Sequence, residues 1–133
     1  MNPNSASILA TAKETIDLEF AAIANLNNLL DNNFSSAVEL IYNSKGRVII
    51  TGIGKSAIIA SKIVATLNST GTPAVFMHAA DAIHGDLGLI LKDDIVICIS
   101  KSGNTPEIKV LVPLIKKAQN KMIAMTGNMD SFL

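Results

Sequence analysis

Asp94-Ile95-Val96-Ile97-Cys98-Ile99-Ser100 is an almost continuous apolar run with one polar residue at each end. Such a run is typical of a β-strand that is covered on both faces, as the strands of a parallel sheet are. Within the run, Cys98 is interpreted as a small buried hydrophobe rather than as a nucleophile. Three other runs share this character and are expected to join the same sheet: residues 47–51, 73–77 and 121–126.

Helices are expected between these strands. Apolar residues recur at helical spacing over residues 56–69 and 106–120. Pro113 lies inside the second segment and is expected to kink this helix or split it in two. The alternation of strands and helices implies right-handed crossovers and an open α/β sheet.

The chain before the first strand is expected to be helical. A first helix is capped by Ser5 or Ser7 and extends to about residues 31–33, and a second covers about residues 35–42. We therefore expect a helical segment over residues 1–45.

The rest of the chain, residues 46–133, is expected to be the α/β core of the same single domain, which spans residues 1–133. Asp130 or Ser131 is placed to cap a helix that does not follow in the sequence. A sheet of four strands also leaves an exposed apolar edge. We infer that the last part of the domain is missing.

The charge balance argues against two classes of partner. The 133 residues contain 11 Lys and Arg against 11 Asp and Glu, so there is no electrostatic footprint for nucleic acid or for an anionic membrane. Residues 1–14 lack the pattern of a signal peptide, and no apolar run approaches the length of a membrane span. A cytoplasmic location is expected.

A glycine-containing loop, Thr-Gly-Ile-Gly-Lys-Ser-Ala over residues 51–57, follows the first strand and opens a helix. A P-loop is rejected because Ile49 stands where that motif needs Gly. A dinucleotide fingerprint matches, but the second strand ends without the acidic residue that would hold a ribose. The third interpretation is a sugar-phosphate loop in which Lys55 and Ser56 face the ligand; the ordinary alternative is a tight turn with a solvated lysine.

A second polar loop, Ser-Lys-Ser-Gly-Asn-Thr-Pro-Glu over residues 100–107, follows the third strand. Pro106 fits the first position of a helix, which makes Thr105 the cap. Hydroxyl and amide side chains, one glycine and a helix N-terminus then form a suitable nest for a phosphate dianion. The alternative is that these are ordinary turn and cap residues.

The positions of the two loops favour a shared ligand site. In the common strand order 2-1-3-4, strands one and three are neighbours and their crossovers leave toward opposite faces. Ligands bind at this switch point. Both loops follow these two strands, so we expect them to border the same crevice.

Two His and two Asp fall within residues 78–86, at His78, Asp81, His84 and Asp86. Imidazole and carboxylate are metal ligands, but the spacing matches no familiar zinc pattern, so a metal site is the less favoured of two interpretations and structural histidines are the favoured one. His84 has the more loop-like surroundings of the two histidines.

Three segments together resemble the sugar isomerase (SIS) domain, and more narrowly the arabinose-5-phosphate isomerases of the KpsF/GutQ family: residues 52–56, 78–89 and 100–108. The resemblance implies a flavodoxin-like three-layer α/β/α sandwich with a mainly parallel, doubly wound sheet. It implies a homo-oligomer, usually a tetramer, that binds a pentose phosphate. No cofactor is expected.

Members of the family interconvert ribulose 5-phosphate and arabinose 5-phosphate, the first step toward the Kdo sugar of lipopolysaccharide or capsule. The resemblance implies that Lys55, His84 and Glu107 lie in the active site. It also implies that small polar residues and glycines surround the phosphate and the substrate: Gly54, Ser56, Ser100, Ser102, Gly103, Asn104 and Thr105. A mechanistic hypothesis makes Glu107 the base, Lys55 the group that polarises the carbonyl, and His84 a proton shuttle or an aid to ring opening.

The sequence departs from the family at several points. Ala57-Ile58 stand where Gly-His is usual, and Lys101 where Asn is frequent. A further catalytic His and an acidic residue have no counterpart before Leu133, so this chain alone is expected to be inactive. Two rival functions remain: a non-catalytic SIS module that senses a phosphosugar, and a dinucleotide-binding fragment.

Overall fold

The computed structural model describes residues 4–133, so the first three residues of the expected helical segment lie outside the described residues. The chain divides into two compact units, Met1–Val38 and Glu39–Leu133. The boundary falls within helix α2 (Asn32–Tyr42).

In its described residues the first unit is mainly helical, as predicted, but its first helix ends at Asn25 and not near residues 31–33. Helix α1 spans Ser5–Asn25 and is followed by the short 3-10 helix η1 (Leu26–Asn28). The cap is Asn4, whose side chain accepts a hydrogen bond from the backbone N–H of Ser7 at 2.8 Å. The prediction of Ser5 or Ser7 as the cap was therefore wrong, because an Asn one to three residues earlier reaches the same orphan N–H groups.

Helix α2 also begins earlier than predicted. Asp31 accepts hydrogen bonds from the backbone N–H groups of Asn33 and Phe34 at 2.9 and 3.3 Å, which caps a helix that starts at Asn32 rather than near Ser35. The break between α1 and α2 is thus set by an aspartate that satisfies free N–H groups of the next helix.

The second unit contains a parallel sheet in the order β2-β1-β3-β4, as predicted. The four strands are β1 (Val48–Gly52), β2 (Ala74–His78), β3 (Ile95–Ser100) and β4 (Lys121–Thr126). Each predicted run lies within one residue of an observed strand. Arg47 and Asp94 stand just outside their strands, where the side chain of Asp94 accepts a hydrogen bond from the backbone N–H of Arg47.

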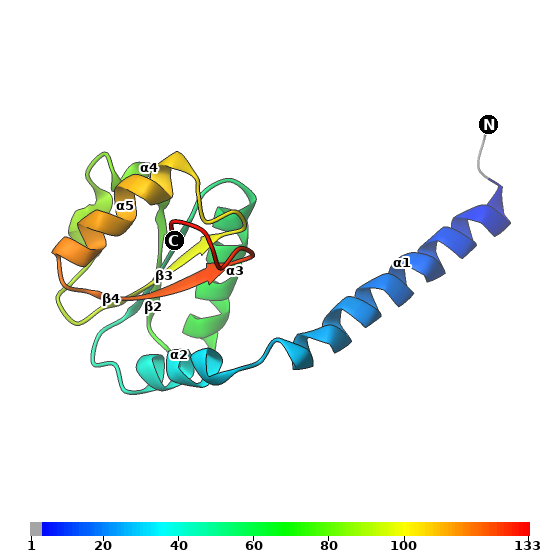
Figure 1. Cartoon of the computed structure of the whole chain (residues 1–133), viewed down its shortest axis with the longest axis horizontal. Coiled ribbons are helices and arrows are strands. Elements are labelled where there is room, and N and C mark those ends of the chain that lie inside the picture. The colour runs from blue at the N-terminus through cyan, green and yellow to red at the C-terminus, as the bar shows by residue number, and fades with distance from the viewer. Residues whose placement is uncertain (1–3) are drawn as a thin grey trace. The chain divides into compact units, whose positions relative to one another are not determined.

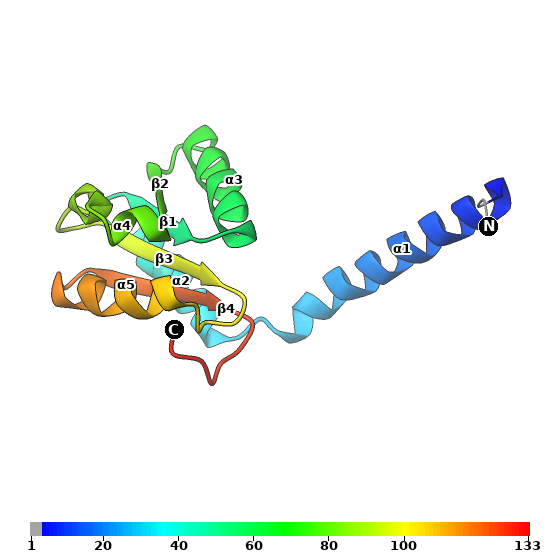
Figure 2. The ribbon, with the colours of Figure 1, turned by 90° about the horizontal axis from the view of Figure 1, so that it is seen from above.

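Helices cover the two faces of this sheet (Figures 1 and 2). Helix α3 (Lys55–Ser69) packs on β1 and β2, and α5 (Pro106–Lys117) packs on β3 and β4 from the opposite face. Helix α5 is continuous through Pro113, so of the two expected effects, a kink or a split, the split is wrong. The exposed position of the proline lets its ring face solvent.

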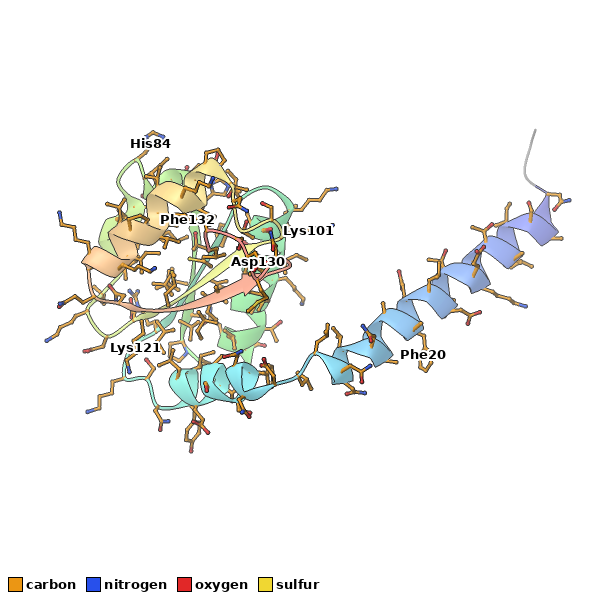
Figure 3. The ribbon with its side chains drawn as sticks, viewed as in Figure 1. Phe20, His84, Lys101, Lys121, Asp130 and Phe132 are labelled. Carbon is orange, nitrogen blue, oxygen red and sulfur yellow. The ribbon has the colours of Figure 1, made fainter. Side chains whose placement is uncertain are left out.

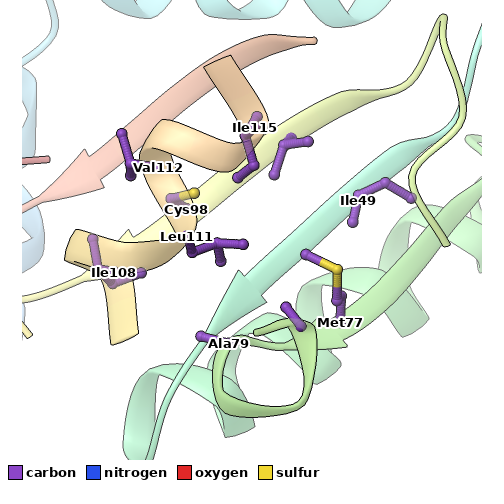
Figure 4. Packing of buried hydrophobic residues seen from close by; sticks show 10 residues of the cluster. Ile49, Met77, Ala79, Cys98, Ile108, Leu111, Val112 and Ile115 are labelled. Carbon is purple, nitrogen blue, oxygen red and sulfur yellow. The ribbon is translucent and has the colours of Figure 1, made fainter. Parts of the chain in front are cut away.

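The core consists of two clusters, one on each face of the sheet. Figure 4 shows the cluster beneath α5, where Ile49, Cys98 and Leu111 are fully buried. Cys98 is fully buried, which confirms its interpretation as a buried hydrophobe, and burial raises the pKa of its thiol to about 12. Alternating residues of the same strands, such as Val48 and Ile50, fill the other cluster beneath α3.

The segment between β2 and β3 forms a short helix, α4 (Ala79–Ala82), and a 3-10 helix, η2 (Asp86–Leu89). Among residues 4–133, no helix combines the length and apolarity needed to cross a bilayer.

Candidate functional site

The loops that follow β1 and β3 border one pocket of about 370 Å³. Because the two strands are neighbours and parallel, their carboxyl ends meet at one edge of the sheet. The pocket is lined by residues from both loops: Ile53, Ser56, Ser100, Lys101, Ser102 and Thr105. The predicted shared crevice at the switch point is therefore present.

The first loop turns sharply before α3. Gly54 has a φ of 57° and a ψ of −127°, which a side chain would disfavour. No side chain among residues 4–133 caps the helix that begins at Lys55. The N-terminus of α3 therefore presents its partial positive charge next to Ser56, which lines the pocket. Lys55 is exposed.

The second loop starts from a buried serine. Ser100 accepts a hydrogen bond from the backbone N–H of Gly103 at 3.1 Å, which draws the loop into a tight turn. The Oγ of Ser102 accepts the backbone N–H of Asn104 at 3.3 Å, and Asn104 donates from its side chain to the Ser102 carbonyl at 3.1 Å. These bonds fix the relative positions of the hydroxyls of Ser100 and Ser102.

Thr105 occupies the cap position before Pro106, as predicted. Its hydroxyl makes no capping hydrogen bond; it is buried and has no partner among the described residues. A buried hydroxyl without a partner costs about 1–3 kcal/mol. Since this hydroxyl belongs to a pocket-lining residue, a ligand oxygen is the natural group to satisfy it.

The arrangement is suited to an anion. Four hydroxyl side chains and two helix N-termini without side-chain caps converge on one pocket among residues 4–133. Hydroxyls and helix N-termini both favour a phosphate dianion over a neutral group. The net charge of the chain is zero, so this preference is local.

Several other predicted site residues do not line the pocket. Gly54, Gly103 and Asn104 belong to the two loops but do not line the pocket, and Glu107 is half-buried in the first turn of α5. His84 does not reach the pocket: it is exposed on the segment between α4 and η2 and projects outward (Figure 3).

Lys101 and Ile53 line the pocket although neither was predicted as a site residue. Both lie inside the loops that were singled out, so their position in sequence was a sufficient signal. In the sequence, Lys101 stands out only as a departure from the family pattern. Lys101 is exposed, so it brings a positive charge to the rim of the pocket that it helps to line.

The histidines and aspartates of residues 78–86 do not form a metal centre in the described structure. Across residues 4–133, no three His, Cys, Asp or Glu side chains are grouped as a metal ion would require. His78 lies 3.8 Å from Asp81, measured between Nδ1 and Oδ2.

Comparison with known proteins assigns a family to the second unit. A family model described as the SIS domain matches residues 40–133. Arabinose 5-phosphate isomerase KdsD of Pseudomonas aeruginosa is 49% identical over 121 residues, which cover 91% of this chain and 37% of the relative. Arabinose 5-phosphate isomerase KpsF of Escherichia coli O6:H1 is 46% identical, with coverage of 95% and 39%. The chain thus spans about two fifths of the length of these curated relatives.

A solved structure of an Escherichia coli CFT073 protein in complex with arabinose 5-phosphate shares the fold with a TM-score of 0.93. The two sequences are 38% identical, and the match covers 98% of this chain and 70% of the other. The family match includes the whole sheet and both pocket loops. The chain belongs to the SIS domain family.

Proposed function

We propose that this chain is the phosphosugar-binding part of an arabinose 5-phosphate isomerase, which interconverts D-ribulose 5-phosphate and D-arabinose 5-phosphate. The observation that carries the proposal is the pocket at the switch point, with its four hydroxyls and two uncapped helix N-termini among residues 4–133. The names of the relatives and the arabinose 5-phosphate complex of the similar structure support the choice of sugar.

In this proposal the phosphate occupies the pocket and the sugar extends toward the mouth. Ser100 lies at the buried end and Lys101 and Ser102 are exposed. The hydroxyl of Thr105, which has no hydrogen-bond partner among the described residues, donates to a phosphate oxygen. The remaining hydroxyls donate in the same way, at the short distances typical of charged acceptors.

Aldose–ketose isomerisation moves a proton between adjacent carbons through an enediol, so it needs a base and an electrophile close to the phosphate anchor. Glu107 lies two residues after Thr105, and Lys55 directly precedes Ser56. Both are therefore proposed to act at the carbon skeleton, Glu107 as the base and Lys55 on the carbonyl oxygen. The role of His84 as a proton shuttle rests on the family resemblance alone.

Titration calorimetry with arabinose 5-phosphate and with inorganic phosphate tests the binding claim. Thr105→Val keeps the shape of the side chain and removes its hydroxyl, and we expect at least tenfold weaker binding of both ligands. Thr66→Val is the matched control, because Thr66 is exposed in the body of α3 and donates only to the carbonyl of Lys62. Equal affinity of Thr105→Val and wild type would contradict the proposal, and tighter binding of NAD than of either phosphate would favour a dinucleotide site.

Turnover is tested separately with a coupled assay on ribulose 5-phosphate, using a protein that contains the remaining length found in the relatives. Lys55→Ala in that protein is expected to abolish turnover and to leave the thermal unfolding temperature unchanged. Binding without turnover in the wild type would instead indicate a sensing module.

We further propose a cytoplasmic homo-oligomer, a tetramer by family resemblance, whose product feeds Kdo synthesis for lipopolysaccharide or capsule. The apolar residues of α1 support oligomer formation: Phe20 is 73% exposed, and Ile16 and Ile23 are similarly exposed, while α1 has no buried residue. Light scattering after size exclusion tests this, and Phe20→Ser with Ile16→Ser is expected to reduce the assembly. A monomeric wild type would contradict it.

A further inference from the structure

Residues 127–133, which follow β4, lie along the loop of residues 100–105. The backbone N–H of Gly127 donates to the carbonyl of Lys101 at 3.1 Å, and that of Leu133 donates to the carbonyl of Gly103 at 3.0 Å. Between them, the N–H of Phe132 donates to Oδ1 of Asn104 at 3.1 Å. Figure 3 shows Lys101 and Asp130 near the carboxyl ends of β3 and β4. The segment Gly127–Leu133 therefore contacts three of the four residues between Lys101 and Asn104.

Side-chain packing joins the same two segments. A Cβ added at Gly103 would overlap the side chain of Ser131. Gly103 also has a φ of 65°, so glycine is required there by both conformation and space. The Oγ of Ser131 is buried and has no hydrogen-bond partner among residues 4–133. Ser131 is thus held against the back of the loop by packing.

The segment is itself held at both ends. At its start, Thr126 accepts the backbone N–H of Asn128 with its hydroxyl at 3.2 Å, and Asn128 accepts the N–H of Asp130 with its side chain at 3.0 Å. At its end, Leu133 packs against the core cluster that contains Ile108. A segment fixed in this way can restrain a loop, whereas a mobile one cannot.

We propose that Gly127–Leu133 is a positioning segment, which holds the loop of residues 100–105 in the conformation that binds the phosphate of the substrate. The inference rests on the proposed function, since it assigns a role in that same site. A binding loop that must be ordered on ligation loses affinity, because the entropy cost is subtracted from the binding free energy. Three hydrogen bonds and one packed side chain reduce that cost before the ligand arrives. None of the segment's residues lines the pocket, so its effect is indirect.

Phe132→Pro in the 133-residue chain tests the proposal, because it removes the N–H that Asn104 accepts. Phe132→Ala is the matched control: it removes the half-exposed ring and keeps the N–H. Inorganic phosphate and arabinose 5-phosphate are titrated by calorimetry, and amide hydrogen exchange is followed at Gly103 and Asn104. We expect at least tenfold weaker binding and at least tenfold faster exchange of these two amides in Phe132→Pro. Amides of β3 are expected to exchange as in wild type, and Phe132→Ala to bind within twofold of it.

Affinity of Phe132→Pro within twofold of wild type would overturn the proposal. If that variant does not fold, Asn128→Ala decides the question, because it loosens the turn without touching the loop. Asn128→Ala is expected to weaken binding at least threefold, with Met129→Ala, an 85% exposed neighbour, as its control. Unchanged binding in Asn128→Ala would also overturn the proposal. If wild type binds neither phosphate, the proposed function fails, and the exchange rates at Gly103 and Asn104 still show whether the segment orders the loop.

Discussion

The carboxylate of Asp94 accepts hydrogen bonds from Nη2 of Arg47 at 2.7 Å, from Nε of Arg47 at 3.3 Å and from the backbone N–H of Arg47 at 2.8 Å. The two residues immediately precede β1 and β3. Asn120, just before β4, donates to the carbonyl of Asp94 at 3.0 Å. This network therefore ties together the starts of three neighbouring strands, at the edge of the sheet opposite the pocket.

Asp94→Asn is expected to lower the free energy of unfolding by about 2–3 kcal/mol. Removing one partner of a buried ion pair costs roughly 3–5 kcal/mol, and the value here is reduced because the Arg47 side chain is 32% exposed. Urea unfolding followed by circular dichroism measures the change. Asp93→Asn is the control, since Asp93 is exposed, and is expected to stay within about 0.5 kcal/mol of wild type. An equally small effect at Asp94 would show that the network does not stabilise the fold.

The same carboxylate predicts a stability loss in acid. Burial acts to raise the pKa of Asp94, but hydrogen bonds from Arg47 and from the backbone of Leu91 outweigh it and hold the pKa below its ordinary value. An unfolded Asp has a pKa of about 3.9. The stabilisation is therefore complete well above that value and is lost as the pH falls through the lower pKa of the folded state. Unfolding free energies of wild type and Asp94→Asn, measured from pH 6 down to pH 3, are expected to converge as the pH falls. A constant difference over this range would contradict the assignment.

Pro113→Ala is expected to stabilise the chain by about 1–2 kcal/mol. Proline inside a helix costs roughly 3 kcal/mol relative to alanine, and part of this is offset because proline also restricts the unfolded chain. Pro113 is exposed, so its replacement leaves the core unchanged. Thermal unfolding measures the gain. A destabilised variant would show that the ring of Pro113 makes a contact that alanine cannot replace.

Lys101→Asn is expected to weaken phosphate binding about threefold and to reduce its dependence on salt. An exposed charge contributes up to about 1 kcal/mol, and screening by salt reduces that contribution. Lys121→Asn is the matched control, because Lys121 begins β4 at the opposite end of the sheet from Lys101 (Figure 3). Calorimetric titrations with phosphate at low and at high salt distinguish the two variants. Equal effects of the two substitutions would assign Lys101 only a nonspecific role.

The sheet could be predicted from the sequence because each buried strand is a continuous apolar run, as Ile95–Ser100 illustrates. Helix starts were less predictable, because several polar residues near each start compete to be the cap. Asn4 and Asp31 cap the helices in place of nearby serines, because their side chains reach free N–H groups of the first turn. That choice depends on backbone geometry more than on residue type.

The parts of the site that depend on residues close together in the sequence could be predicted. Pro106 indicated the start of α5, and this placed Thr105 at the cap. The contacts of residues 127–133 with the loop at 100–105 had no local signature, since they join residues about 28 positions apart in the sequence. Local sequence indicated only that Asp130 or Ser131 could cap a following helix, and it gave no sign of the packing of Ser131 on Gly103.

A crystal structure of this chain with arabinose 5-phosphate tests the central claim most directly. We predict that the phosphate lies in the pocket between the loops after β1 and β3. Its oxygens should be within about 2.6–3.2 Å of the hydroxyls of Ser102 and Thr105. A sugar phosphate bound elsewhere on the chain, with this pocket occupied only by water, would contradict the account.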